Sequence, residues 1–172
     1  RAASLLLSIV PFRVKKMYDH KIAYLIDILQ LSEQYDYVFF DGFSTLLYAK
    51  EYKKNHVYID DEDITDLMKR RFEDEKNPIL KAFFYIEQIK CKAFEKKYLQ
   101  RVKHIWAISP NSAEHLGDST QTPITVMPTL VSMQKNIFNP EAKDIIFTGL
   151  LSWMENVNGV KCRIEHGDRF AL

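Results

Sequence analysis

The stretch HVYIDDEDIT, residues 56–65, decides how this chain folds. Its first half is an apolar run that predicts a buried strand, and its second half is a cluster of acids. Because ligands of parallel α/β sheets bind beyond the carboxyl ends of the strands, these acids are candidate site residues. Three interpretations are open: a D-x-D-x-T phosphotransfer motif with Asp61, Asp63 and Thr65, a D-x-D site for a divalent metal and a sugar diphosphate, or the polar rim of a sheet.

Strand-like runs alternate with helical patterns along the chain. The aromatic and β-branched run YDYVFFDG, residues 35–42, is apolar on both faces, which is typical of a buried parallel strand. Further strands are predicted in HIWAIS (104–109), TPITVMP (122–128) and DIIFTGLL (144–151). This alternation predicts the fold class α/β, with a Rossmann-like parallel sheet and helices covering both faces.

Helices are predicted between these strands. The apolar spacing of residues 21–34 predicts one helix, and FSTLLYAKEYKK, residues 43–54, predicts another. A long helical region after the acidic cluster breaks at Asn77-Pro78, because a residue before proline avoids the α region. Ser109 is a favourable N-cap for the helix that follows it.

Length and composition are those of a globular protein with one ordinary core. The chain has 172 residues and a net charge of +1, so no large nucleic-acid footprint is expected. Cys91 and Cys162 fit no metal spacing, and we interpret them as reduced thiols of a cytoplasmic protein. The apolar segment AASLLLSIV, residues 2–10, is too short to span a membrane and is interpreted as an internal helix of a longer protein.

Two basic stretches have open interpretations. Residues 90–103 and FRVKKMY, residues 12–18, are interpreted first as a solvated helix face and the edge of a core. A peripheral contact of either stretch with a membrane surface or another polyanion is the alternative.

Polar residues at the predicted strand ends are candidate site residues. Asp41, Asp60 and Asp61 follow the first two strands, and Ser109 and Asn111 follow the third. Each of these side chains can also cap a helix, which is the simpler explanation for any single one of them.

Gly149 lies between a predicted strand and ENVNGVK, residues 155–161, which is typical of a helix start. Glycine lets the backbone approach a ligand closely, and a helix N-terminus offers free N–H groups to a diphosphate. A strand–glycine–helix turn that serves packing alone stays open as an alternative.

The phosphotransfer interpretation needs a second acid, a magnesium ion and a lysine beside the nucleophilic aspartate. Asp61, Asp63 and Thr65 have the required spacing, but the ordinary helical sequence DLMKRR follows them. The pair Gly167-Asp168 lies at the end of the chain with nothing behind it. These residues by themselves assign no metal and no cofactor.

Six segments follow one another in a specific order. YDYVFFDGFSTLLYA combines a strand and a helix, and HVYIDDEDITDLMKRR combines a strand ending in Asp60 and Asp61 with a helix that carries Arg70. A long helix with Glu87 and Glu95 comes next. IWAISPNSAEHL, ITVMPTLVSMQKNIF and IIFTGLLSWMENVNGVK complete the series.

This order, over residues 13–161, resembles the middle of a GT-B glycosyltransferase of the family-four, or group-one, type. The resemblance implies an incomplete acceptor-side domain at residues 1–130, a hinge at 131–143 and the truncated start of a donor-binding domain at 144–172. It also implies transfer of a sugar from a nucleotide-diphosphate sugar to a glycan or lipid-linked acceptor, with retention of configuration and without a metal.

Within this resemblance, Asp41, Asp60 and Asp61 line the acceptor side of the cleft, and Gly149 and Leu150 lie near the donor diphosphate. No catalytic residue is assigned. The implied role is polysaccharide biosynthesis in the cytoplasm, and attachment to the inner face of the membrane is a family expectation.

The chain departs from the family pattern in two places. Its hinge has PTL, residues 128–130, where the family prefers Pro-Asn-Gly, and its tail CRIEHGDRFAL, residues 162–172, replaces an expected aromatic pair and long helix. The tail is interpreted as a truncation or a change of reading frame. Two alternatives therefore stay open: a HAD-like phosphatase or phosphotransferase that uses Asp61 and Asp63, and an inactive truncated product.

Overall fold

The computed structural model describes residues 8–32, 35–51, 53–129, 141, 145–151, 154–165 and 170–171. The chain divides into two compact units, Arg1–Leu130 and Val131–Leu172, which we describe separately. The predicted hinge, residues 131–143, lies outside the described residues except for Glu141. The functions expected of the predicted domains stay predictions.

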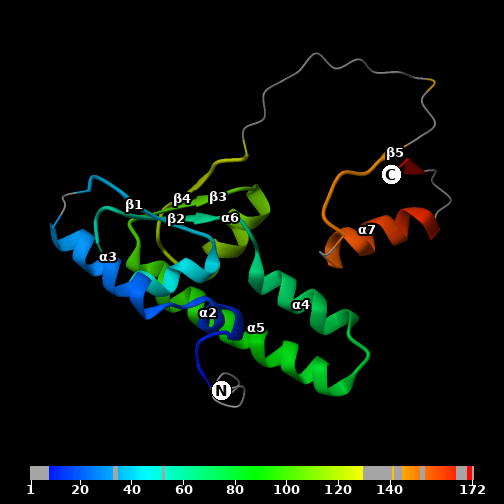
Figure 1. The fold of residues 1–172 in the computed structure, drawn as a ribbon, viewed down its shortest axis with the longest axis horizontal. Helices are drawn as coiled ribbons and strands as arrows, with labels where there is room; N and C mark the ends of the chain where they lie inside the picture. The colour runs from blue at the N-terminus through cyan, green and yellow to red at the C-terminus, as the bar shows by residue number, and fades with distance from the viewer. Residues whose placement is uncertain are drawn as a thin grey trace. The chain divides into compact units, whose positions relative to one another are not determined.

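The first unit contains a four-stranded parallel sheet with the strand order β1–β2–β3–β4 (Figure 1). Its strands are β1 (Val38–Asp41), β2 (His56–Asp60), β3 (His104–Ala107) and β4 (Ile124–Val126). All four fall within stretches whose sequences predict strands. The structure thus confirms the α/β class and the Rossmann-like parallel sheet.

Helices precede the sheet and connect its strands. They are α2 (Phe12–Met17), α3 (His20–Ser32), the 3₁₀ helix η1 (Phe43–Tyr48), α4 (Ile64–Asp74), α5 (Pro78–Tyr98), the 3₁₀ helix η2 (Leu99–Arg101) and α6 (Pro110–Gly117). Among these described helices, none combines the length and the apolar character needed to cross a lipid bilayer.

Three helix starts are capped by side chains that the local sequence supplies. Asp63 accepts a hydrogen bond from the Asp66 amide at the start of α4, and Ser109 accepts one from the Ser112 amide at the start of α6. Asn77 caps α5 directly before a proline. The break predicted at this proline and the predicted Ser109 cap are both confirmed.

The helix predicted over residues 43–54 is wrong in its length and type. The chain forms only the short η1 helix and then turns back toward the sheet. Fourteen residues, 42–55, connect β1 to β2. Phe43 and Leu46 of η1 are buried in the core, so this short helix already packs the connection against the sheet.

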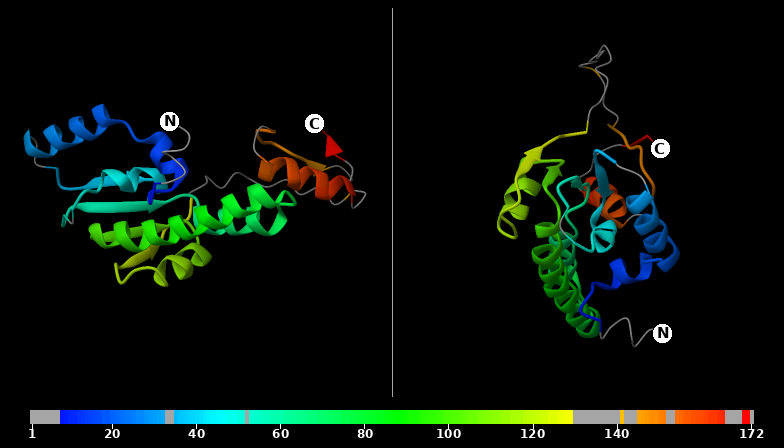
Figure 2. Two further views of the ribbon diagram at one scale, coloured as in Figure 1. Left: turned by 90° about the horizontal axis from the view of Figure 1, so that it is seen from below. Right: turned by 90° about the vertical axis from the view of Figure 1, so that its left-hand side faces the viewer.

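Helices cover one face of the sheet, whereas the sequence predicts cover on both. Phe40, Tyr58 and Ile105 share a face because the register pairs them, and each is at most 3% exposed. This face packs on the helices, which lie beneath the strands in the right-hand view of Figure 2. On the other face Phe39 is 46% exposed and contacts the ring of Trp106 at 5.1 Å between centroids.

The apolar side of α3 also contacts solvent. Ile22, Leu25 and Leu29 have the helical spacing of a core-facing stripe, yet they are 48%, 54% and 38% exposed. Only Ala23 of this helix is buried. The hydrophobic pattern therefore predicts the helix correctly and does not predict its environment.

The second unit contains a separate two-stranded parallel sheet of β5 (Ile145–Ile146) and β6 (Phe170–Ala171), with α7 (Met154–Glu165) between them in sequence. The strand predicted over residues 144–151 is thus only two residues long, and β6 was not predicted. The predicted N-terminal helix lies mostly outside the described residues, and residues 8–10 are not helical.

The packing of the core predicts that two leucine-to-alanine substitutions lower the free energy of unfolding by very different amounts. Leu46 is fully buried between the sheet and the helices, whereas Leu25 is 54% exposed. Leu46→Ala should lower the free energy of unfolding by about 2–4 kcal/mol, because it leaves a cavity. Leu25→Ala should change it by less than about 1 kcal/mol. Urea denaturation followed by circular dichroism measures both, and equal effects would contradict this packing.

Candidate functional site

An open pocket of about 600 Å³ lies between α4, α5 and α6. The chain enters α4 and α6 directly after the carboxyl ends of β2 and β3, so the pocket borders the edge where parallel sheets bind ligands. Its lining is mainly polar and includes Asp63, Thr65, Lys69, Lys92, Asn111 and His115.

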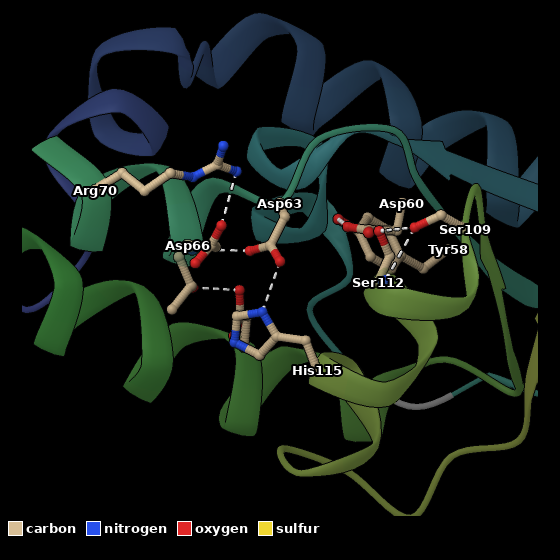
Figure 3. A network of polar contacts seen from close by, with 10 residues as sticks. Tyr58, Asp60, Asp63, Asp66, Arg70, Ser109, Ser112 and His115 are labelled. Carbon is tan, nitrogen blue, oxygen red and sulfur yellow. Dashed lines mark hydrogen bonds and ion pairs between the residues drawn. The ribbon is translucent and has the colours of Figure 1, made fainter.

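Asp63 and His115 form the central contact of this pocket. His115 Nδ1 and Asp63 Oδ2 are 2.6 Å apart, and Asp63 Oδ1 accepts the Asp66 amide at 2.8 Å (Figure 3). The hydrogen bond to Asp63 raises the pKa of His115. Burial acts to raise the pKa of Asp63, but the hydrogen bonds from His115 and the Asp66 amide outweigh it and the pKa is lowered. The charged forms of the two side chains therefore stabilise each other.

Glu95 lies behind the pocket, buried in α5. It is 3% exposed, and its Oε1 accepts a hydrogen bond from the Thr65 hydroxyl. Its Oε2 has no hydrogen-bond partner among the residues that the structure describes. Burial raises the pKa of Glu95 to about 7, against the lowering effects of Thr65 and His115. This carboxyl group can therefore exchange a proton near neutral pH.

Asp60, the last residue of β2, is also buried. It is 3% exposed, and its Oδ1 accepts the Tyr58 hydroxyl at 2.8 Å. Burial raises the pKa of Asp60 to about 6, and the nearby charges of Asp63 and Asp61 act in the same direction. Four ionisable groups, Asp60, Asp63, Glu95 and His115, thus influence one another at the end of this strand.

The candidate acids predicted from the sequence lie in different environments at this edge. Asp41 and Asp61 are exposed, whereas Asp60 is buried. Asp41 pairs with Ile59 in the register and therefore points to the sheet face opposite that of Asp60. Asp61 lies over Gly42, where a Cβ atom would come within 3.2 Å of its Oδ1. Gly42 has a φ of 80°, which requires glycine.

The other candidates act in capping or packing. Ser109 caps α6, and Asn111 lines the pocket. In the second unit, a Cβ atom on Gly149 would lie 2.7 Å from the Phe147 ring and 3.0 Å from the Asn156 amide nitrogen. A larger residue at position 149 would therefore crowd these two side chains. Leu150 is 68% exposed, and its carbonyl accepts a hydrogen bond from the Asn156 side chain.

The residues of the D-x-D-x-T motif have separate roles in the structure. Asp61 is exposed, Asp63 caps α4 and pairs with His115, and Thr65 is 1% exposed and donates to Glu95. Within the part of the chain that the structure describes, no group of three or more histidine, cysteine, aspartate or glutamate side chains could hold a metal ion.

His115 and Tyr58 were not predicted as site residues. Glu95 was noted only within the family resemblance. The detectable signal is a glutamate at core-facing helical spacing, because Cys91 lies four residues before Glu95 and Tyr98 lies three residues after it. No comparable signal pointed to His115, which is 52 residues from Asp63 in the sequence.

Comparison of the chain with protein-family models, with curated proteins and with solved structures finds no match.

The raised pKa of Glu95 predicts a pH-dependent stability. A folded-state pKa of about 7, against 4.5 for an ordinary glutamate, means that the folded protein binds this proton more tightly than the unfolded chain. The associated stability is complete below about pH 4.5 and is lost as the pH rises through about 7. The glutamine in the Glu95→Gln variant stays neutral at every pH. Between acidic and mildly alkaline pH, the free energy of unfolding of this variant should therefore fall by about 1–3 kcal/mol less than that of the unchanged protein.

Urea denaturation at a series of pH values measures this difference. Asp60, Asp63 and His115 still titrate in the variant, so the difference reports the Glu95 proton together with its coupling to these groups. Glu73→Gln is the control, because Glu73 is exposed on α4 and its loss should leave the pH profile unchanged. Parallel profiles for the Glu95→Gln variant and the unchanged protein would contradict the prediction.

Proposed function

We propose that the protein is a GT-B glycosyltransferase and that its first unit binds the acceptor. The observation that carries this proposal is the polar pocket beside the carboxyl ends of β2 and β3, with its paired Asp63 and His115. Carboxylates, amides and lysines at such a pocket accept and donate the hydrogen bonds that sugar hydroxyls require. The acceptor is a glycan or a lipid-linked sugar.

The exposed acids at the strand ends provide further contacts in this proposal. Asp61 and Asp41 are exposed at the carboxyl edge and can accept hydrogen bonds from acceptor hydroxyls. Asp60 is buried, and the hydrogen bond that its carboxylate accepts from the Tyr58 hydroxyl positions the end of β2. Their role is to orient the acceptor, because correct placement of two reactants lowers the barrier to transfer.

We assign the donor to the second unit. It contains a strand, a turn with Gly149 and Leu150, and the helix α7, the order in which N–H groups can bind a diphosphate. Such N–H groups and basic side chains would stabilise the leaving diphosphate without a metal ion. The proposed reaction retains the configuration of the sugar and takes place in the cytoplasm.

Asp61→Asn tests the proposal. Asp61 is exposed, so the substitution should leave the fold intact while it weakens hydrogen bonds to the acceptor. With the protein expressed over its full length, transfer from a panel of radiolabelled nucleotide sugars to lipid-linked acceptors should fall by about tenfold or more, the loss expected for a hydrogen bond to a charged group. Asp74→Asn, an exposed aspartate at the end of α4, is the control and should transfer normally.

Two results would favour the alternatives. Magnesium-dependent capture of beryllofluoride at Asp61 would favour the phosphotransferase. Absence of transfer by the unchanged protein with every donor would favour an inactive product. Normal transfer by the Asp61→Asn variant would remove Asp61 from the acceptor site.

A further inference from the structure

The face of the sheet opposite the helices carries a row of three aromatic rings. Tyr37 and Phe39 are 58% and 46% exposed, and their ring centroids lie 6.1 Å apart with an angle of 29° between the planes. Phe39 also contacts Trp106, which is partly buried, at 5.1 Å and 38°. We call Tyr37, Phe39 and Trp106 the aromatic platform.

The aromatic platform crosses the sheet above β2. Phe39 belongs to β1 and Trp106 to β3, the two strands on either side of β2. Neighbouring strands are about 4.8 Å apart, so the backbones of β1 and β3 are about 10 Å apart. A centroid spacing of 5.1 Å means that both rings lean over β2, where Val57, the register partner of Phe39, is only 3% exposed. The rings are thus held by packing from below and open to solvent above.

Polar side chains flank the platform on the same face. Asp41 is exposed and lies two residues after Phe39, so both point to one side of the sheet. Thr125 is exposed and pairs with Trp106 in the register, and its Oγ1 lies 2.8 Å from Nε2 of His104. Groups that can donate or accept hydrogen bonds therefore lie on both sides of the aromatic rings.

The charge of this face limits the class of ligand. The platform and its flanking residues Asp41, His104 and Thr125 include one acid and neither lysine nor arginine. Aromatic platforms that stack nucleic-acid bases are accompanied by cations along the phosphate backbone. A neutral ligand with flat apolar faces and many hydroxyl groups matches the rings and the flanking polar groups better.

We propose that the aromatic platform binds a neutral oligosaccharide. The C–H groups of a sugar ring form an apolar face that packs on an aromatic ring, and its hydroxyl groups can bond with Asp41 and Thr125 at the flanks. The centroid spacings of 5.1 and 6.1 Å are close to the length of one sugar unit, so successive units of a chain can lie on successive rings. The proposal concerns binding alone and does not depend on the proposed transfer reaction.

A pair of aromatic rings on the helices provides a matched control. Tyr85 of α5 is 51% exposed, and its ring centroid lies 5.5 Å from that of Phe72 of α4, with an angle of 46° between the planes. The ammonium group of Lys81 lies 5.1 Å from the centroid of the Phe72 ring. Tyr85 and Tyr37 are thus similarly exposed and each contacts another ring, but Tyr85 lies on the helices and away from the open face of the sheet.

The test uses the fluorescence of Trp106. The chain has two tryptophans, so Trp153→Phe in the full chain leaves Trp106 as the single tryptophan. Titration of this protein with cellohexaose, maltohexaose and chitohexaose should give a saturable change in emission with at least one of them. Tyr37→Ala in the same background should weaken that binding by about three- to tenfold, because one stacking ring is lost. Tyr85→Ala should bind as the unchanged protein does.

Urea denaturation of each variant shows whether its fold is intact. Phe39→Leu is the second variant, because leucine keeps an apolar cover over Val57 while the ring is removed, and it should weaken binding as Tyr37→Ala does. Absence of a saturable change with all three oligosaccharides would overturn the proposal, and so would equal losses for Tyr37→Ala and Tyr85→Ala.

Two further results would overturn the proposal in favour of another ligand. Tighter binding of single-stranded oligothymidylate than of any of the oligosaccharides would assign the platform to nucleic acid. A dimer in size-exclusion chromatography that Tyr37→Ala dissociates and Tyr85→Ala does not would assign it to a second copy of the chain.

Discussion

The parallel pairing of β2 with β1 on one side and β3 on the other is the constraint on which the rest of the first unit depends. It buries four of the five residues of β2, among them Asp60. Because parallel strands end at one edge, it also brings the entries of α4 and α6 together there. The ionisable groups of the candidate site meet at this edge for that reason.

Burial then sets the chemistry of the groups that meet. Asp60 and Glu95 each have one hydrogen bond from a hydroxyl group and little solvent, so their protonated forms are favoured. Asp63 instead has hydrogen bonds with His115 and the Asp66 amide, and these lower its pKa. The carboxyl groups at the end of β2 and on the adjacent helices therefore lose their protons at different pH values. A protonated carboxyl group can donate a hydrogen bond, whereas an ionised one only accepts, so the site can offer both.

In the first unit, helices cover one face of the sheet and leave the other face exposed. The helices bury one face of the sheet, while Phe39 on the other face and the apolar sides of α3 and α5 remain exposed. Apolar surface of this kind marks interaction sites in soluble domains. The exposed lysines of α5 distinguish it from the other two surfaces.

The sequence by itself determined the four strands, the break before Pro78 and the cap at Ser109, because these depend on neighbouring residues. Only the tertiary structure decided that the helical pattern after Gly42 ends at Tyr48, where Phe43 and Leu46 already pack η1 into the core. Tertiary structure also decided the partners of Asp63 and the burial of Glu95. Both depend on contacts between residues far apart in the sequence, 52 positions for Asp63 with His115 and 30 for Thr65 with Glu95, which no local pattern records.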